Sequence, residues 1–139
     1  MIIKYNDFLK EYNKHLYKGD EVWNIANKGG SEHNDSLEYL EDTIKRNDYY
    51  LIDLSVKVAI QGDADIKSII YDQGMKDNIE YSKYRKITQP IIIGEISRGG
   101  NSIKEGVIDG SNRLAQALNN GDKTIKAFIP TTSSYIKYI

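Results

Sequence analysis

The sequence contains no cysteine, only two histidines and no long apolar run. The absence of cysteine excludes a disulfide framework, a thiolate zinc site and thiol catalysis. Two histidines, both distant in sequence from the motif described below, argue against a histidine-activated nucleophile. Because no apolar stretch approaches the ~18–20 residues of a transmembrane helix and no secretory signal opens the chain, we expect a cytoplasmic protein without a membrane partner.

Charge is balanced over the whole chain but not along it. The 139 residues carry 19 basic and 20 acidic side chains. Residues 1–70 hold 9 basic and 13 acidic side chains, whereas residues 71–139 hold 10 basic and 7 acidic ones. The excess of positive charge in the second half suits an anionic ligand, although it is smaller than that of a strongly basic DNA-binding domain.

The first part of the chain reads as helical. Apolar residues recur at helical spacing, and glycine or asparagine follows where each pattern stops, so the sequence predicts helices over residues 6–18, from about 35 to 47, and from 63 to 74. Gly19 is expected to end the first of these. We expect residues 1–48 to form a helical N-terminal extension packed on a domain that comprises residues 49–139.

The second part of the chain is rich in strand-forming residues. Strands are predicted at residues 50–54, 56–60, 91–96, 103–108 and 124–129, with a helix over residues 111–118. The glycine-rich turn at residues 98–101 predicts that the third and fourth of these strands form a hairpin. The pattern indicates a single compact α+β domain with a small mixed sheet and packed helices.

A strand-to-helix junction at residues 106–118 carries the clearest chemistry. Asp109-Gly110 turns the chain and glycine lets the backbone lie close to a ligand. Ser111 is expected to cap the helix that follows. Unpaired N–H groups, the positive end of a helix dipole and the Arg113 guanidinium then meet at one point, which is the chemistry of a phosphate site.

Four residues of this junction, Gly110, Ser111, Asn112 and Arg113, are expected to hold phosphates, and Asp109 to bind Mg²⁺ through the nucleotide or to accept a proton. The same residues also fit an ordinary turn, an ordinary helix cap and a solvated arginine, because a short glycine motif is a weak signal.

The Asp-Gly-x-x-Arg-Leu-Ala core resembles the nucleotide-binding motif of the ParB/sulfiredoxin superfamily, and the resemblance extends over about residues 49–130. It implies a ParB/sulfiredoxin-like fold with a bound nucleoside triphosphate such as Mg-ATP. Members of that superfamily act as CTP-dependent DNA clamps, ATP-dependent phosphoryl-transfer enzymes and nucleases. We therefore expect triphosphate binding, with phosphoryl transfer as an associated activity.

Three departures from the family pattern limit what the resemblance implies. Ser111 stands where sulfiredoxins carry their catalytic cysteine, and Asn112 replaces the histidine common before the arginine. Asparagine keeps hydrogen bonding but cannot transfer a proton near neutral pH. No helix-turn-helix domain follows before Ile139, so a full ParB is not expected.

Other charged residues extend the candidate site. Glu95 is a candidate catalytic base or Mg²⁺ partner, although a solvent-facing strand residue is the simpler interpretation, and Arg98 is a second candidate phosphate contact. Lys83, Arg85 and Lys86 alternate with tyrosines, as in surfaces that bind single-stranded nucleic acid. Two other functions therefore remain open: a ParB-like nuclease or DNA-binding protein, and a non-catalytic interaction or inhibitor protein of a phage or mobile element.

Overall fold

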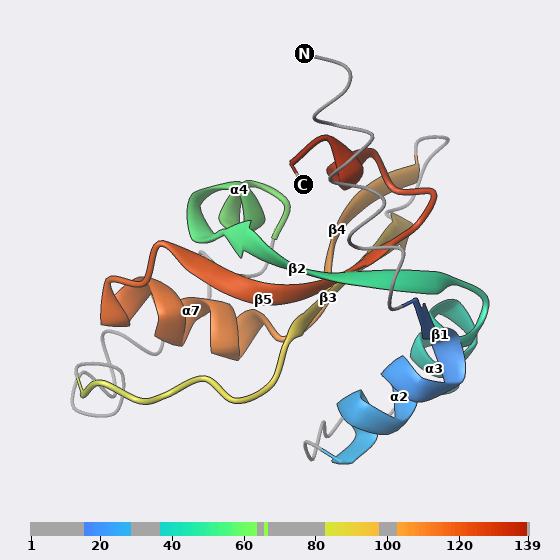
Figure 1. The fold of residues 1–139 in the computed structure, drawn as a ribbon, viewed down its shortest axis with the longest axis horizontal. Helices are drawn as coiled ribbons and strands as arrows, with labels where there is room; N and C mark the ends of the chain where they lie inside the picture. Colours follow the sequence, from blue (N-terminus) through green and yellow to red (C-terminus); the bar gives the residue numbers. More distant parts are fainter. Residues whose placement is uncertain (1–15, 29–36, 64–65, 67–82, 98–102, 139) are drawn as a thin grey trace.

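The computed structural model describes residues 16–28, 37–63, 66, 83–97 and 103–138. These residues form one α+β domain, in which a five-stranded mixed sheet carries helices on both faces (Figure 1). The expected fold class, with a small mixed sheet and packed helices, is confirmed at this level.

The sheet has the order β1-β2-β5-β3-β4. Its strands are β1 (Tyr17–Lys18), β2 (Asp48–Ser55), β3 (Ile91–Ser97), β4 (Ile103–Asp109) and β5 (Thr124–Pro130). All neighbouring strands are antiparallel except β3 and β5, which are parallel. The hairpin of β3 and β4 and the final strand β5 agree with the sequence predictions. Because β1 pairs with β2, the segment before residue 48 contributes to the sheet as well as to the helices.

Four α-helices lie within the described residues: α2 (Gly19–Lys28), α3 (Leu37–Lys45), α4 (Val56–Gln61) and α7 (Ser111–Asn120). A 3-10 helix, η1 (Ser134–Tyr138), follows the last strand. Helices α2 and α3 pack on one face of the sheet, and α4 and α7 pack on the other. None of these helices has the length and apolar character that crossing a membrane requires.

Side-chain alternation along the strands divides the core between the two faces. In β5, Phe128 faces α2 and α3. Its ring forms T-shaped pairs with Tyr17 and Tyr49, with ring centroids 5.0 and 6.3 Å apart. The neighbouring Ile129 faces α4 and α7. The sheet is therefore buried on both sides over much of its area.

The prediction of a strand over residues 56–60 is wrong, because these residues form α4. The Ser55 hydroxyl accepts a hydrogen bond from the Val58 N–H at 3.4 Å and caps the helix. Val56 and Ala59 then face the core at helical spacing. The local preference of valine and isoleucine for strands is weak enough for burial of this face to override it.

The predicted end of the first helix at Gly19 is also wrong. Residues 17–18 form β1 and Gly19 begins α2, while residues 6–15 and most of the helix predicted over 63–74 lie outside the described residues. A Cβ at Gly19 would lie 2.6 Å from the carbonyl oxygens of Ile44 and Lys45. Glycine is required here because the chain passes close to the end of α3, not because a helix stops.

Candidate functional site

Strand β4 leads directly into α7 through Asp109 and Gly110. Gly110 has φ +106°, in the left-handed region that favours glycine. A Cβ on this residue would lie 2.7 Å from Ile91 Cγ2 and 2.9 Å from Arg113 Nη2. The junction therefore needs glycine for its backbone conformation and for the close approach of the arginine side chain.

The N-cap of α7 is Gly110 and not Ser111, which corrects the sequence prediction. Ser111 is the first helical residue, since the sharp turn is made by the glycine, and the chain is helical from the next residue onward. A glycine cap has no side chain with which to accept a hydrogen bond from the N–H groups of the first turn. Those donors are consequently not consumed by a capping side chain.

Arg113 folds back over Gly110 and joins two strands to the start of the helix. Its Nη2 donates to Asp109 Oδ2 at 3.1 Å and to the Pro90 carbonyl at 3.2 Å. Asp109 is only 4% exposed, whereas the Arg113 side chain is 25% exposed. The Arg113 Nε is buried without a hydrogen-bond partner among the described residues. The guanidinium is thus oriented by a buried carboxylate while part of its donor capacity is unused.

The structure does not bring Glu95 to this junction. Glu95 is exposed on β3 and pairs in register with Glu105 on β4. Glu105 precedes Asp109 by four residues, a separation of about 13 Å along the strand. Glu105 instead accepts hydrogen bonds from the Ser133 hydroxyl and from the Ser134 N–H, the latter at 3.0 Å. Arg98 lies outside the described residues.

Lys83, Arg85 and Lys86 lie on an irregular segment, residues 83–90, that runs beside α7. Gln116 Nε2 donates to the Lys83 carbonyl at 3.1 Å. Asn120 makes two bonds to Arg85: its Nδ2 donates to the carbonyl at 2.8 Å and its Oδ1 accepts from the N–H at 3.3 Å. A further bond of 2.7 Å joins Gln116 Nε2 to Asn120 Oδ1.

Gln116 and Asn120 are functional candidates that the sequence did not predict. The signal for Gln116 is its position between two alanines on a helix that packs on the sheet, since a glutamine that is only 8% exposed needs hydrogen-bond partners. Asn120 lies four residues later, on the same side of the helix. Nothing in the sequence identifies Lys83 and Arg85 as their partners.

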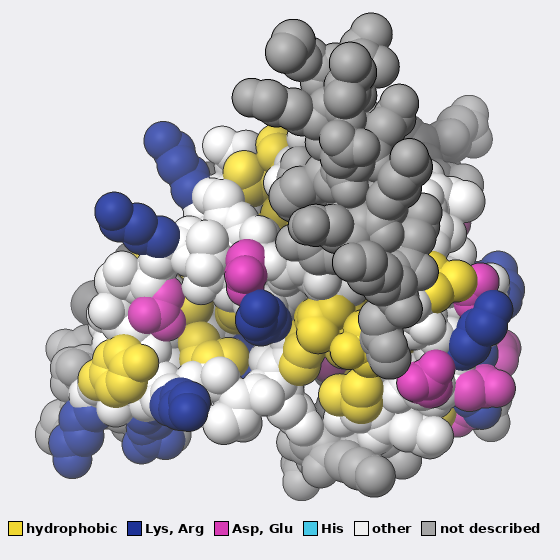
Figure 2. Space-filling view, viewed as in Figure 1, with side chains coloured by type: hydrophobic (Ala, Val, Ile, Leu, Met, Phe, Trp, Pro, Cys, Tyr) yellow, Lys and Arg dark blue, Asp and Glu magenta, His cyan; other side chains and the backbone are white. Residues whose placement is uncertain are grey.

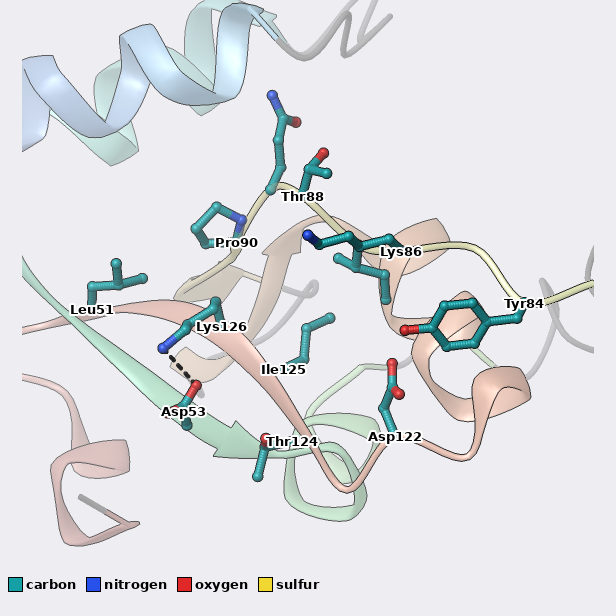
Figure 3. Close-up of a pocket in the computed structure, with 12 residues that line it drawn as sticks. Leu51, Asp53, Tyr84, Lys86, Thr88, Pro90, Asp122, Thr124, Ile125 and Lys126 are labelled. Carbon is teal, nitrogen blue, oxygen red and sulfur yellow. Dashed lines mark ion pairs between the residues drawn. The ribbon is translucent and has the colours of Figure 1, made fainter.

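Segment 83–90 forms one wall of a groove whose floor is the end of β2 and the start of β5 (Figure 3). The volume of the groove is about 360 Å³. Its lining residues are Leu51, Asp53, Tyr84, Lys86, Ile87, Thr88, Gln89, Pro90, Asp122, Thr124, Ile125 and Lys126. On the floor, Lys126 Nζ pairs with Asp53 Oδ1 at 2.8 Å. Because Pro90 also accepts from Arg113, the groove adjoins the strand-to-helix junction.

The described residues do not form a site built to hold Mg²⁺ on its own. Within these ranges no group of three His, Asp or Glu side chains is close enough to bind one ion. Asp109, the carboxylate of the motif, already contacts Arg113. Since Mg²⁺ usually keeps its waters and binds to few protein carboxylates together with substrate phosphates, a metal at this junction would have to be held mainly by a bound nucleotide.

Comparison with family models, with curated proteins and with solved structures found no match to this chain.

Proposed function

We propose that the chain binds a nucleoside triphosphate of the ATP type, with its phosphates at the start of α7. The observation that supports this most directly is the position of Arg113. Its guanidinium is oriented by buried Asp109 and stands over Gly110, and a quarter of the Arg113 side chain is exposed. A phosphate would supply acceptors for an arginine that is already oriented, at the positive end of a helix.

Each residue of the motif has a distinct part in this proposal. Gly110 leaves room at the turn, while Ser111 and exposed Asn112 supply first-turn N–H groups and side-chain donors. Asp109 acts as a positioning residue, because it is buried against the guanidinium. Mg²⁺ would accompany the triphosphate and be held by its phosphates. Phosphoryl transfer would in addition require an acceptor that the described residues do not identify.

A charge substitution in the first turn of α7 tests this proposal without removing a structural contact of Arg113. Asn112→Asp places a carboxylate beside the phosphates, but an acidic residue in a first turn favours the helix dipole, so we expect the fold to be retained. Titration calorimetry with ATP, CTP and GTP, each with Mg²⁺, should show saturable binding to the wild type. In N112D the affinity should be about tenfold lower, equivalent to ~1.4 kcal/mol.

Asn119→Asp is the matched control, since it makes the same charge change at an exposed position near the other end of α7. Equal weakening by N112D and N119D would mean that only overall charge matters, which contradicts a site at the start of the helix. Absence of triphosphate binding by the folded wild type would reject the proposal and favour the interaction-protein hypothesis.

A further inference from the structure

The groove beside segment 83–90 is a second candidate site, and it involves none of the motif residues. Helices α2 and α3 cover Tyr49, Ile92 and Phe128 on one face of the sheet. Farther along the same face, the exposed Asp53 and Lys126 and the half-buried Leu51 are among the residues that line the groove. Among the described residues, α2 and α3 therefore do not cover this end of the sheet, and segment 83–90 borders it.

The wall of the groove is held in place although it is neither helix nor strand. Gln116 and Asn120 bond to backbone groups of Lys83 and Arg85 at one end of the segment. At the other end, Gln89 Nε2 donates to the Ile25 carbonyl at 3.4 Å, and Pro90 accepts from Arg113. Fixed contacts at both ends mean that the groove is formed before a ligand arrives, which lowers the entropic cost of binding.

An aromatic ring and an ammonium group face this groove without polar partners among the residues that the structure describes. Tyr84 is 70% exposed, and Figure 3 shows its hydroxyl directed into the groove and Lys86 extending across it toward Pro90. Neither the Tyr84 hydroxyl nor the Lys86 ammonium makes a hydrogen bond or an ion pair with another described residue. An exposed ring beside an unpaired cation is suited to a ligand that has both a flat aromatic group and a negative charge.

The charge around the groove extends beyond its lining. The groove itself is lined by two cationic side chains, Lys86 and Lys126, and by two carboxylates, Asp53 and Asp122. Exposed cationic residues are also adjacent in sequence to its lining residues: Lys83, Arg85 and Lys123. Lys126 partly neutralises Asp53 through their ion pair. Figure 2 shows Lys and Arg side chains gathered on the side of the molecule where segment 83–90 and α7 lie in Figure 1. The positive charge therefore lies beside the groove as well as in it, which suits a chain of phosphates better than a single phosphate.

We propose that the groove binds single-stranded nucleic acid. One base stacks on Tyr84 and its phosphate is neutralised by Lys86, while adjacent phosphates of the strand approach Lys83 and Lys123. The volume of about 360 Å³ lies within the range of ~300–1,000 Å³ typical of small-ligand pockets, which is adequate for one nucleotide unit. Stacking on an aromatic ring beside a basic surface is the usual mode of binding to single strands, and it is tolerant of sequence.

Fluorescence anisotropy with labelled 12-mers of deoxythymidine and of uridine tests this proposal. Tyr84→Leu should weaken binding about tenfold through loss of stacking. Lys86→Gln should weaken binding and lower the slope of log affinity against log salt concentration by about 0.7, the value for one phosphate contact to a single strand. Tyr39→Leu and Lys57→Gln are matched controls, because they remove an exposed tyrosine from α3 and an exposed lysine from α4.

Two further ligands distinguish a single strand from other ligands. A duplex of the same length should bind at least about tenfold more weakly, because its bases are not available for stacking; equal binding would overturn the proposal. Thymidine or uridine monophosphate that competes as well as the 12-mer at equal nucleotide concentration would also overturn it, in favour of a free nucleotide. The proposal would also be overturned if the groove variants and their controls weakened binding equally, or if the wild type did not bind the 12-mers.

These experiments test the groove proposal and the α7 proposal separately. N112D should leave binding of the 12-mers within about twofold of the wild type, and Tyr84→Leu should leave triphosphate binding unchanged. If N112D weakens both ligands and Tyr84→Leu weakens neither, the single strand binds at the start of α7 and the groove proposal is rejected.

Discussion

Tyr49 illustrates how one buried polar group couples two elements of this fold. Its side chain is fully buried between α3 and the sheet, and its hydroxyl donates to the Ile44 carbonyl at 3.1 Å. Burial raises the pKa of Tyr49 to about 12 from the ordinary value of 10.0, the nearby Asn47 and Arg46 lowering it only in part. The hydroxyl therefore remains protonated in the folded protein at pH values where it would ionise in the unfolded chain.

The raised pKa of Tyr49 predicts a loss of stability at alkaline pH. The protonated Tyr49 hydroxyl contributes fully to the free energy of unfolding below pH 10. This contribution is lost as the pH rises from 10 toward 12, because the unfolded chain releases the proton first. At pH 8, Tyr49→Phe should be less stable than the wild type by about 1 kcal/mol, because one buried hydrogen bond is lost. The difference in stability between wild type and Tyr49→Phe should vanish at about pH 11. Urea unfolding at several pH values measures both effects.

Tyr39→Phe, at an exposed position of α3, is the control for general effects of tyrosine ionisation. A stability difference between wild type and Tyr49→Phe that stays constant from pH 8 to pH 11.5 would contradict the assigned role of Tyr49.

At the scale of elements, α7 is bounded by two glycines whose requirements differ. Gly110 and Gly121 both have positive φ, of 106° and 76°. A Cβ at Gly110 would press on Ile91 and Arg113, whereas a Cβ at Gly121 would meet nothing within 4 Å. Gly121 is thus needed for backbone conformation alone, while Gly110 is needed for conformation and for space at the candidate site.

Alanine substitutions at the two glycines separate these contributions. Gly121→Ala should lower the free energy of unfolding by about 1 kcal/mol, the cost of a left-handed conformation for alanine. Gly110→Ala should cost more, about 2–3 kcal/mol, because steric crowding adds to that strain. Urea denaturation gives both values. Equal losses would mean that Ile91 and Arg113 move aside without cost and that Gly110 has no packing role.

At the scale of the whole molecule, one sheet supports two separate apolar layers. Phe128 contributes to the layer beneath α2 and α3, and Ile129 contributes to the layer beneath α4 and α7. The two residues are adjacent in β5, which pairs with both β2 and β3. Because both apolar layers include residues of β5, we expect the described domain to unfold as one cooperative unit.

Trp23, the single tryptophan, reports on the α2 layer from a buried position in α2. Ile129→Val, on the opposite face, should cost about 1 kcal/mol. It should shift the urea midpoint of Trp23 fluorescence as far as the midpoint of far-UV circular dichroism. Phe128→Leu, a substitution on the α2 side, serves as the comparison. Separate midpoints for the two signals in Ile129→Val would show that the α2 and α3 layer unfolds independently.

The sequence by itself determined the strands of the hairpin, the final strand and the helix that follows Gly110, although this helix has Gly110 as its N-cap and extends to Asn120. Alternating or continuous apolar residues, and glycines at turns, act through local geometry, and no distant partner is needed to recognise them. It also identified residues 109–113 as one unit, because neighbours at a strand-to-helix junction remain neighbours in space.

Only the tertiary structure decided the features that depend on distant residues. It made α4 a helix, since burial of Val56 and Ala59 outweighs a weak local preference for a strand. It placed Glu95 away from Asp109 through the register of β3 and β4. It also brought Gln116 and Asn120 to segment 83–90 and thereby built the groove, through contacts that span more than 30 residues of sequence. Such pairings depend on how the chain packs, which local spacing does not encode.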